Sequence, residues 1–120
     1  MTMTETTFNT TILRRGIEDR DASTLLDLYA DDAEVIIVDR TNPPSSPQVM
    51  SGRAEIGRFL EQVSSRDMTH TLSRMTADAS TAAYLEECEY PDGTKVLCTA
   101  MLDLTDGRIV RQVGVQAWDE

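Results

Sequence analysis

Three side chains of this 120-residue sequence are candidates for moving protons: Asp39, His70 and Glu86. His70 is the only histidine, and histidine is the side chain whose charge ordinarily changes near neutral pH. Asp39 ends an apolar run, and Glu86 lies in a segment whose polarity alternates. Histidines and carboxylates are the usual general acids and bases of enzymes. The three residues therefore suggest acid–base catalysis.

Each candidate also has a structural interpretation. Asp39 can open the turn that follows it, or form an ion pair with Arg40 or Arg53. His70 can be a hydrogen-bonded histidine at the end of a strand. The acidic run at residues 86–89 can simply decorate an exposed strand. The direction in which each side chain points distinguishes its catalytic interpretation from its structural one.

The elements that position these residues are predicted from periodicity. Apolar side chains at helical spacing predict helices over about residues 5–19, 22–29 and 53–65. The β-branched run Glu34–Asp39 predicts a buried strand, and residues 40–50, which contain three prolines, predict an exposed extended loop. From Met68 onward the period is two, and short turns separate four expected antiparallel strands. These strands cover about residues 68–76, 81–90, 95–104 and 108–118.

This order predicts one α+β domain over residues 1–120, with three N-terminal helices packed on one side of a curved, mainly antiparallel sheet. A curved sheet wrapped around helices encloses a cone-shaped space that is open at one end. A small-molecule ligand in that cone is the expected partner.

Composition and charge exclude several classes of protein. Charged residues make up 27% of the chain and hydrophobic residues 40%, as in ordinary globular domains. The balance of 11 basic against 21 acidic residues gives a net charge of −10. That charge repels phosphate backbones and anionic lipids, so neither nucleic acid nor a membrane surface is an expected partner.

The two cysteines, Cys88 and Cys98, are expected to be free thiols. The N-terminal sequence lacks the basic and apolar regions of a signal peptide, and no apolar run approaches the length of a membrane helix, so a cytoplasmic location is expected. Cys88 and Cys98 flank an expected hairpin turn, and they face each other directly across it if the turn holds three residues. One histidine and two cysteines do not predict a zinc site, and no glycine-rich phosphate loop is present, so no metal or cofactor is expected.

Four short stretches of the sequence carry a family resemblance. They are Asp21, Leu28–Ala33 (LYADDA), Ser51–Ile56 (SGRAEI) and Asp106–Val110 (DGRIV). With the order of elements, they resemble the nuclear transport factor 2-like superfamily, in its SnoaL-like and ketosteroid-isomerase-like branch. The resemblance covers nearly the whole chain and implies a cone-shaped fold with a mixed sheet. It also implies a homodimer across the outer sheet face, where Arg111, Val113 and Val115 point.

Ketosteroid isomerases of this fold use an aspartate base, with a tyrosine and a protonated aspartate as oxyanion donors. Carried over by resemblance, these positions fall on Ile37, Leu13 and Ala100. None of the three can perform its role, so steroid isomerisation by that chemistry is not expected. Asp39 lies two residues beyond the base position, on the same strand face. Dehydratases of the superfamily place a pocket histidine in a strand similar to that of His70.

The resemblance further implies which side chains face the cone. Glu86 is then an inward, desolvated carboxylate of the kind used for acid–base work. The inward residues that are candidates for ligand binding are Tyr84, Cys98, Ala100, Gln112, Gln116 and Trp118. The glutamines are plain surface residues if their face points outward, and both aromatic residues can be core, as is expected of Tyr29.

Two hypotheses follow. The first is a small acid–base lyase, isomerase, cyclase or hydrolase acting on an apolar oxygenated molecule. The second is a non-catalytic ligand-binding or dimeric interaction module. If His70 and Glu86 point to opposite sides of the sheet, the first hypothesis loses its best pair of residues.

Overall fold

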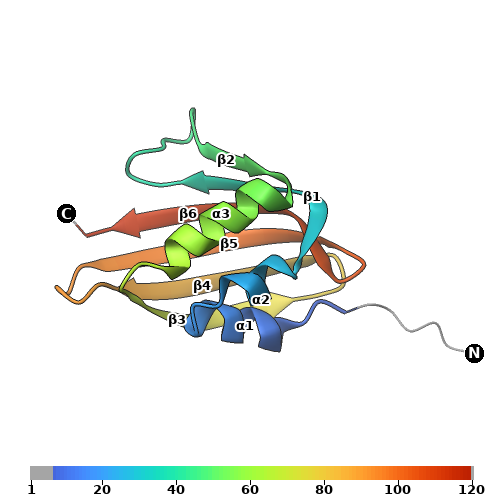
Figure 1. Ribbon diagram of the computed structural model, residues 1–120, viewed down its shortest axis with the longest axis horizontal. Coiled ribbons are helices and arrows are strands. Elements are labelled where there is room, and N and C mark those ends of the chain that lie inside the picture. The colour runs from blue at the N-terminus through green and yellow to red at the C-terminus, as the bar shows by residue number, and fades with distance from the viewer. Residues whose placement is uncertain (1–6, 120) are drawn as a thin grey trace, which may run out of the picture.

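A mixed sheet of six strands is the largest part of the computed structural model, which describes residues 7–119. Its strands are β1 (Tyr29–Val38), β2 (Gln48–Ser51), β3 (Thr69–Ala77), β4 (Thr81–Glu89), β5 (Lys95–Thr105) and β6 (Arg108–Trp118). The helices are α1 (Thr10–Glu18), α2 (Ala22–Leu26) and α3 (Gly52–Ser64). The strand order is β2-β1-β6-β5-β4-β3, and the helices lie over one face of the sheet (Figure 1). The α+β class is therefore confirmed.

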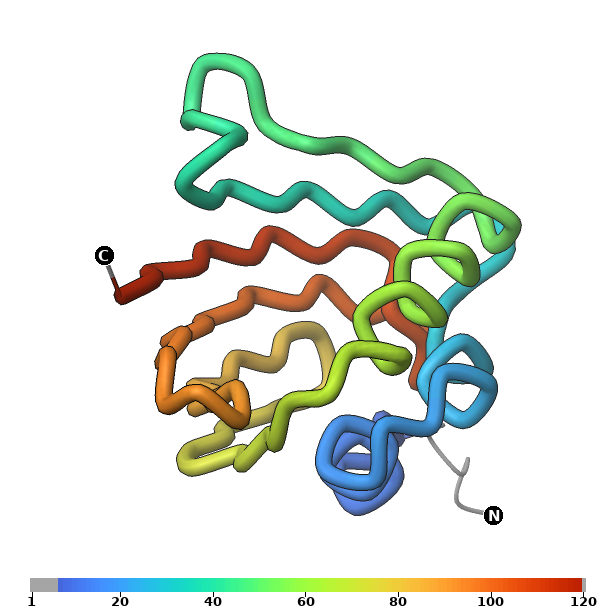
Figure 2. Tube along the Cα trace, turned by 60° about the vertical axis from the view of Figure 1, so that its left-hand side comes forward, coloured from blue at the N-terminus to red at the C-terminus, as the bar shows by residue number. Residues whose placement is uncertain are grey.

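The only parallel pair among the described strands is β1 with β6, and Figure 2 shows these two distant segments running side by side. The four strands β3 to β6 form the expected antiparallel meander. No helix within residues 7–119 has the length and apolar character needed to cross a membrane.

Polar side chains begin the first two helices. The Asn9 side chain accepts a hydrogen bond from Ile12 N at 3.0 Å, and Asp21, the expected cap, accepts one from Thr24 N at 3.2 Å. Such caps satisfy backbone donors that have no partner in the first turn. The predicted start of the first helix, near Glu5, lies outside the described residues, but residues 7–9 are described and are not helical, so the predicted start is wrong.

Two predicted boundaries around the first strand are wrong. The second helix ends at Leu26, because Tyr29 already pairs with Ile109 in β6. Part of the expected loop forms β2, whose residues 48–51 pair with β1. The prolines lie at positions 43, 44 and 47, before β2 begins, and so do not interrupt it. Because β2 precedes the third helix, that helix lies between strands rather than in a run of three N-terminal helices.

The α1 helix is anchored to β3, which is an edge strand of the sheet. Leu72 pairs with Glu86 just before the register shift between Leu72 and Arg74, and no described strand lies on the other side of β3, so the backbone of Leu72 can bond to α1 there. Its carbonyl accepts from Arg14 Nη1 at 2.5 Å, and its amide donates to Glu18 Oε2 at 2.9 Å. The Leu72 side chain is only 1% exposed, so this contact closes the core at that edge of the sheet.

The turn between the two cysteines is longer than the three residues that would make them face each other directly. Cys88 lies opposite Val96, and Cys98 lies opposite Glu86, so the thiols are diagonal rather than directly facing. The hairpin loop between Glu89 and Lys95 holds five residues rather than three. Both cysteines are free thiols in the structure.

Turns in which an aspartate carboxylate accepts hydrogen bonds make the stability of the fold depend on pH in the acid range. Asp78 Oδ1 accepts hydrogen bonds from the amides and hydroxyls of Ser80 and Thr81, which hold the pKa of its carboxyl below the ordinary value of 3.8. When folding lowers the pKa of an acidic group, the ionised group contributes to the free energy of unfolding. That contribution is complete at pH values above the pKa of the group in the unfolded chain. It is lost as the pH falls through the lower pKa of the folded state. The free energy of unfolding should therefore fall below about pH 3.8.

We expect Asp78→Asn to reduce this acid-dependent loss, because asparagine keeps an acceptor oxygen but does not titrate. Urea unfolding at pH 7 and pH 3 measures the effect. The matched control is Asp67→Asn, at an exposed carboxyl that makes no side-chain hydrogen bond among residues 7–119. Equal pH dependence in the two variants would show that the Asp78 turn contributes nothing.

Candidate functional site

A cavity of about 110 Å³ lies between the helices and the inward face of the sheet. Its wall includes Leu13 and Ile17 from α1, Phe59 and Leu60 from α3, and inward side chains of β3 to β6. It leads to an outer pocket of about 560 Å³. The residues that line both spaces are Ile37, Phe59, Val63, Arg66, Gln116 and Trp118. The outer pocket is therefore the entrance to the cavity.

His70 and Glu86 meet at the cavity wall. His70 lies opposite Cys88 in the β3–β4 ladder, and Glu86 follows two residues away on the same face. His70 Nδ1 is 2.5 Å from Glu86 Oε2, and each residue is only 9% exposed. A carboxylate only accepts, so Nδ1 carries the proton of this hydrogen bond. The structure brings together the two residues that the sequence picked out separately.

Cys88 completes this cluster as a protonated thiol. Its Sγ lies 3.1 Å from Glu86 Oε2, to which it donates, and 3.3 Å from His70 Nδ1. The contact with the Cys98 thiol, burial and the nearby Glu86 carboxylate all raise the pKa of Cys88. A thiol that keeps its proton is a weak nucleophile, so this geometry does not favour cysteine-based covalent catalysis.

Two tyrosines, the buried Tyr29 and the partly buried Tyr84, supply hydroxyl groups to the same cavity. Tyr29 Oη donates to Gln112 Oε1 at 2.5 Å, and burial raises the Tyr29 pKa. Burial, and then the charge of Glu86, raise the pKa of Tyr84. The Tyr84 hydroxyl makes no hydrogen bond with the described part of the chain. It is therefore a protonated donor available to a ligand.

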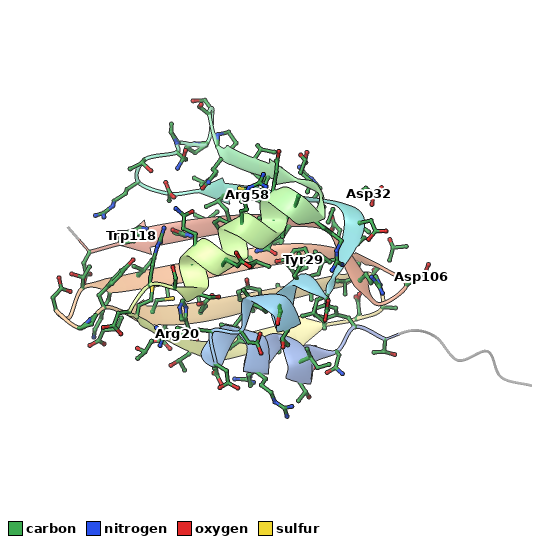
Figure 3. The ribbon with its side chains drawn as sticks, viewed as in Figure 1. Arg20, Tyr29, Asp32, Arg58, Asp106 and Trp118 are labelled. Carbon is green, nitrogen blue, oxygen red and sulfur yellow. The ribbon has the colours of Figure 1, made fainter. Side chains whose placement is uncertain are left out.

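Aromatic and polar side chains surround the entrance. The Arg40 guanidinium lies 4.2 Å from the ring centroid of Trp118, and Tyr90 packs at 5.9 Å from the same ring. Trp118 Nε1 donates to Gln116 Oε1 at 3.1 Å. Figure 3 places Trp118 and Tyr29 toward opposite ends of the sheet, so Trp118 marks the open end and Tyr29 the interior.

Asp39 lies apart from the His70–Glu86 pair, on the wall of the outer pocket. Partial burial raises its pKa, but hydrogen bonds from Asn42 and Thr41 outweigh that effect and hold the pKa below its ordinary value. A depressed pKa makes a carboxylate a weaker base. The geometry thus fits the turn-forming alternative for Asp39, and no ion pair joins it to Arg40 or Arg53 within residues 7–119.

All the inward residues named as ligand contacts line the cavity: Tyr84, Cys98, Ala100, Gln112, Gln116 and Trp118. Leu13, Ile37 and Ala100, the positions that the family resemblance assigned to the catalytic groups of isomerases, also line it. Sequence reasoning missed Tyr29 and Phe59, which it assigned to the core. Their apolar spacing gave no sign that the core contains a cavity.

Comparisons with known proteins concern the family and the fold of the chain. Residues 12–112 match the sequence profile of the family described as SnoaL-like domain. No curated protein matches the sequence.

Three solved structures illustrate the likeness in fold. An NTF2-like protein of unknown function from Mesorhizobium loti has a TM-score of 0.75 at 20% identity, covering 90% of this chain and 89% of the other. A proposed ketosteroid isomerase from Kribbella flavida has a TM-score of 0.73 at 22% identity, covering 92% and 75%. An NTF2-like protein of unknown function from Burkholderia xenovorans has a TM-score of 0.71 at 15% identity, covering 92% and 80%. At these identities the likeness establishes the fold.

Proposed function

The chain belongs to the SnoaL-like domain family, and we propose that it binds a small oxygenated molecule in its cavity and moves protons on that molecule by general acid–base catalysis. The observation that carries this proposal is the hydrogen bond between His70 and Glu86 at the cavity wall. A histidine held by a carboxylate is the usual way to orient a catalytic imidazole.

Three polar side chains of the cavity, His70, Glu86 and Tyr84, have roles in this proposal. Glu86 holds Nδ1 of His70, which leaves Nε2 as the ring nitrogen for the ligand. His70 removes a proton from a carbon next to a carbonyl group, and Glu86 stabilises the imidazolium that forms. The Tyr84 hydroxyl donates to the carbonyl oxygen, on which negative charge develops. If His70 returns the proton to another carbon, the reaction is an isomerisation. If His70 gives the proton to a β-hydroxyl, the Cβ–O bond breaks, water leaves and a Cα=Cβ double bond forms, which is a lyase reaction.

The sizes of the two spaces limit the substrate. Ligand pockets commonly measure about 300–1,000 Å³, whereas the inner cavity is about 110 Å³ and the entrance about 560 Å³. The inner cavity therefore takes the reactive carbonyl end of the molecule. The larger remainder lies between Phe59 and Trp118 at the entrance.

Deuterium exchange tests this function without knowledge of the natural substrate. The purified protein is incubated in D₂O with a panel of ketones, enones and β-hydroxy ketones, and label at the α-carbon is measured by mass spectrometry. A chelator is present throughout, so that any metal-dependent reaction is suppressed. We expect exchange above the uncatalysed rate. Binding without exchange would contradict catalysis and support the non-catalytic ligand-binding alternative.

We also propose that the protein forms a homodimer through the sheet face that the helices leave open. Large apolar side chains on this face are unusually exposed: Val49 48%, Leu97 46%, Met101 60% and Val115 46%. They lie on β2, β5 and β6, and Val113 pairs with Met101 between them. Contiguous apolar patches of this kind mark interaction sites, and a two-fold dimer buries the same patch on both copies.

Met101→Lys is expected to convert the dimer to a monomer, because it places a charge in the centre of the apolar face. Light scattering after size-exclusion chromatography measures the molar mass. Thr11→Lys is the matched control, since it adds the same charge on α1, on the helical side of the molecule. A wild-type chain that is monomeric at high concentration would overturn the homodimer.

A further inference from the structure

The cluster at the cavity wall brings three different metal-ligating atoms together. A histidine ring nitrogen, a glutamate oxygen and a cysteine sulfur, from His70, Glu86 and Cys88, all lie within 4.8 Å of one another. A sequence with one histidine and two cysteines does not by itself predict a metal site. The β3–β4 register assembles one nonetheless, because it pairs His70 with Cys88 and places Glu86 beside both.

We propose that this cluster binds a divalent transition metal of the zinc class, with His70, Glu86 and Cys88 as the protein ligands and a fourth position open to the cavity. Imidazole nitrogen, thiolate sulfur and carboxylate oxygen are the three ligand types that zinc uses in proteins. Three protein ligands with one open position are also typical of zinc sites that take a water or a substrate.

The present separations are close to those that a metal requires. They are 2.5 Å for N–O, 3.1 Å for S–O and 3.3 Å for S–N. Tetrahedral coordination at ordinary zinc distances places such ligand atoms about 3.4–3.6 Å apart. The triangle must therefore widen by less than about 1 Å on each edge. Both His70 and Glu86 line the cavity, which gives their side chains room to rotate.

The charges of the cluster also suit a divalent cation. A carboxylate and a thiolate together supply two negative charges, which balance the metal. Among the described ion pairs, Glu86 is partnered only by His70, so no arginine or lysine competes for the carboxylate. On binding, the protons on His70 Nδ1 and Cys88 Sγ pass to solvent, since a ligand must be deprotonated to coordinate.

This inference goes beyond the proposed function and does not depend on it. A metal on Nδ1 and Oε2 replaces the hydrogen bond that orients His70, so the metal-bound and proton-transferring forms of the cluster exclude each other. Metal binding can be measured with no substrate present.

Cobalt(II) titration of the full-length, metal-free protein tests the site. We expect one cobalt per chain, with the visible bands of tetrahedral cobalt and a thiolate-to-cobalt charge-transfer band, and we expect zinc to displace both. Cys88→Ser should abolish the charge-transfer band and weaken binding by more than about 100-fold, since even outer-shell changes cost 10–100-fold. Thr71→Ala, on the opposite face of β3, is the control and should keep the band. Cys98→Ser tests whether the second cavity thiol, which contacts Cys88 but lies outside the group of three, supplies the sulfur instead.

His70→Gln provides a second variant in case Cys88→Ser does not fold, and it should lose the tetrahedral bands. Circular dichroism verifies that each variant used is folded. The proposal is overturned if the wild-type chain gives no tetrahedral cobalt spectrum with cobalt in excess. It is equally overturned if Cys98→Ser removes the charge-transfer band while Cys88→Ser retains it.

Discussion

Changing His70 to alanine is expected to slow deuterium exchange on a bound carbonyl compound by about 10²–10⁴-fold, the usual contribution of a positioned general base. The loss should fall on kcat, because the cavity walls that bind the molecule are unchanged. Glu86→Gln is expected to lower kcat by more than about tenfold with little change in KM, since glutamine keeps the volume of the side chain but cannot stabilise the imidazolium.

Thr71→Ala is the matched control for the His70 variant. Thr71 is the next residue of β3 and is exposed on the other face of the sheet. The Thr71→Ala protein should therefore exchange deuterium at the wild-type rate. A His70→Ala protein that is folded and exchanges deuterium at the wild-type rate would remove His70 from the chemistry. The exchange would then have to come from another cavity group, such as Tyr84.

The largest effect on stability is expected for Leu102→Ala. Leu102 is 1% exposed in the core, and shortening a buried leucine costs about 2–5 kcal/mol through lost burial and the cavity left behind. Leu97→Ala is the same substitution on the same strand, at a side chain 46% exposed on the outer face. In the monomer its cost should stay within about 0.5 kcal/mol.

Urea unfolding at two protein concentrations separates the core from the proposed dimer interface. The Leu102→Ala loss should be the same at both concentrations. A Leu97→Ala loss that grows with protein concentration indicates an interface, because dimer stability depends on mass action. Equal and large losses for both variants at low concentration would mean that Leu97 lies in the core and that the assigned strand faces are wrong.

The meander could be predicted from the sequence because its signal is local. On β5, small or apolar side chains at 96, 98, 100, 102 and 104 face inward, as the period of two requires. The β2 strand could not be predicted in this way. It has only four residues and owes its conformation to pairing with β1, which lies across a loop that contains three prolines.

The candidate site could be predicted residue by residue but not as a cluster. Both His70 and Glu86 have types suited to chemistry, and the family resemblance implied that Glu86 faces inward. Their contact depends on the β3–β4 register, with its bulge between Leu72 and Arg74, and register is a long-range property that one strand's sequence does not carry. The same limit is why the sequence left open whether Cys88 and Cys98 face each other.

The most direct test of the His70–Glu86 pair is nitrogen-15 NMR of the histidine ring, which gives a single set of ring signals because His70 is the only histidine. The expected spectrum shows a proton on Nδ1 that is hydrogen-bonded and protected from exchange, with Nε2 changing shift when a cavity ligand is added. Glu86→Gln should move the Nδ1 signal. A ring whose nitrogens exchange freely with water, and whose signals are unchanged by either the ligand or Glu86→Gln, would contradict the assignment of His70 and Glu86 as the proton-transfer pair.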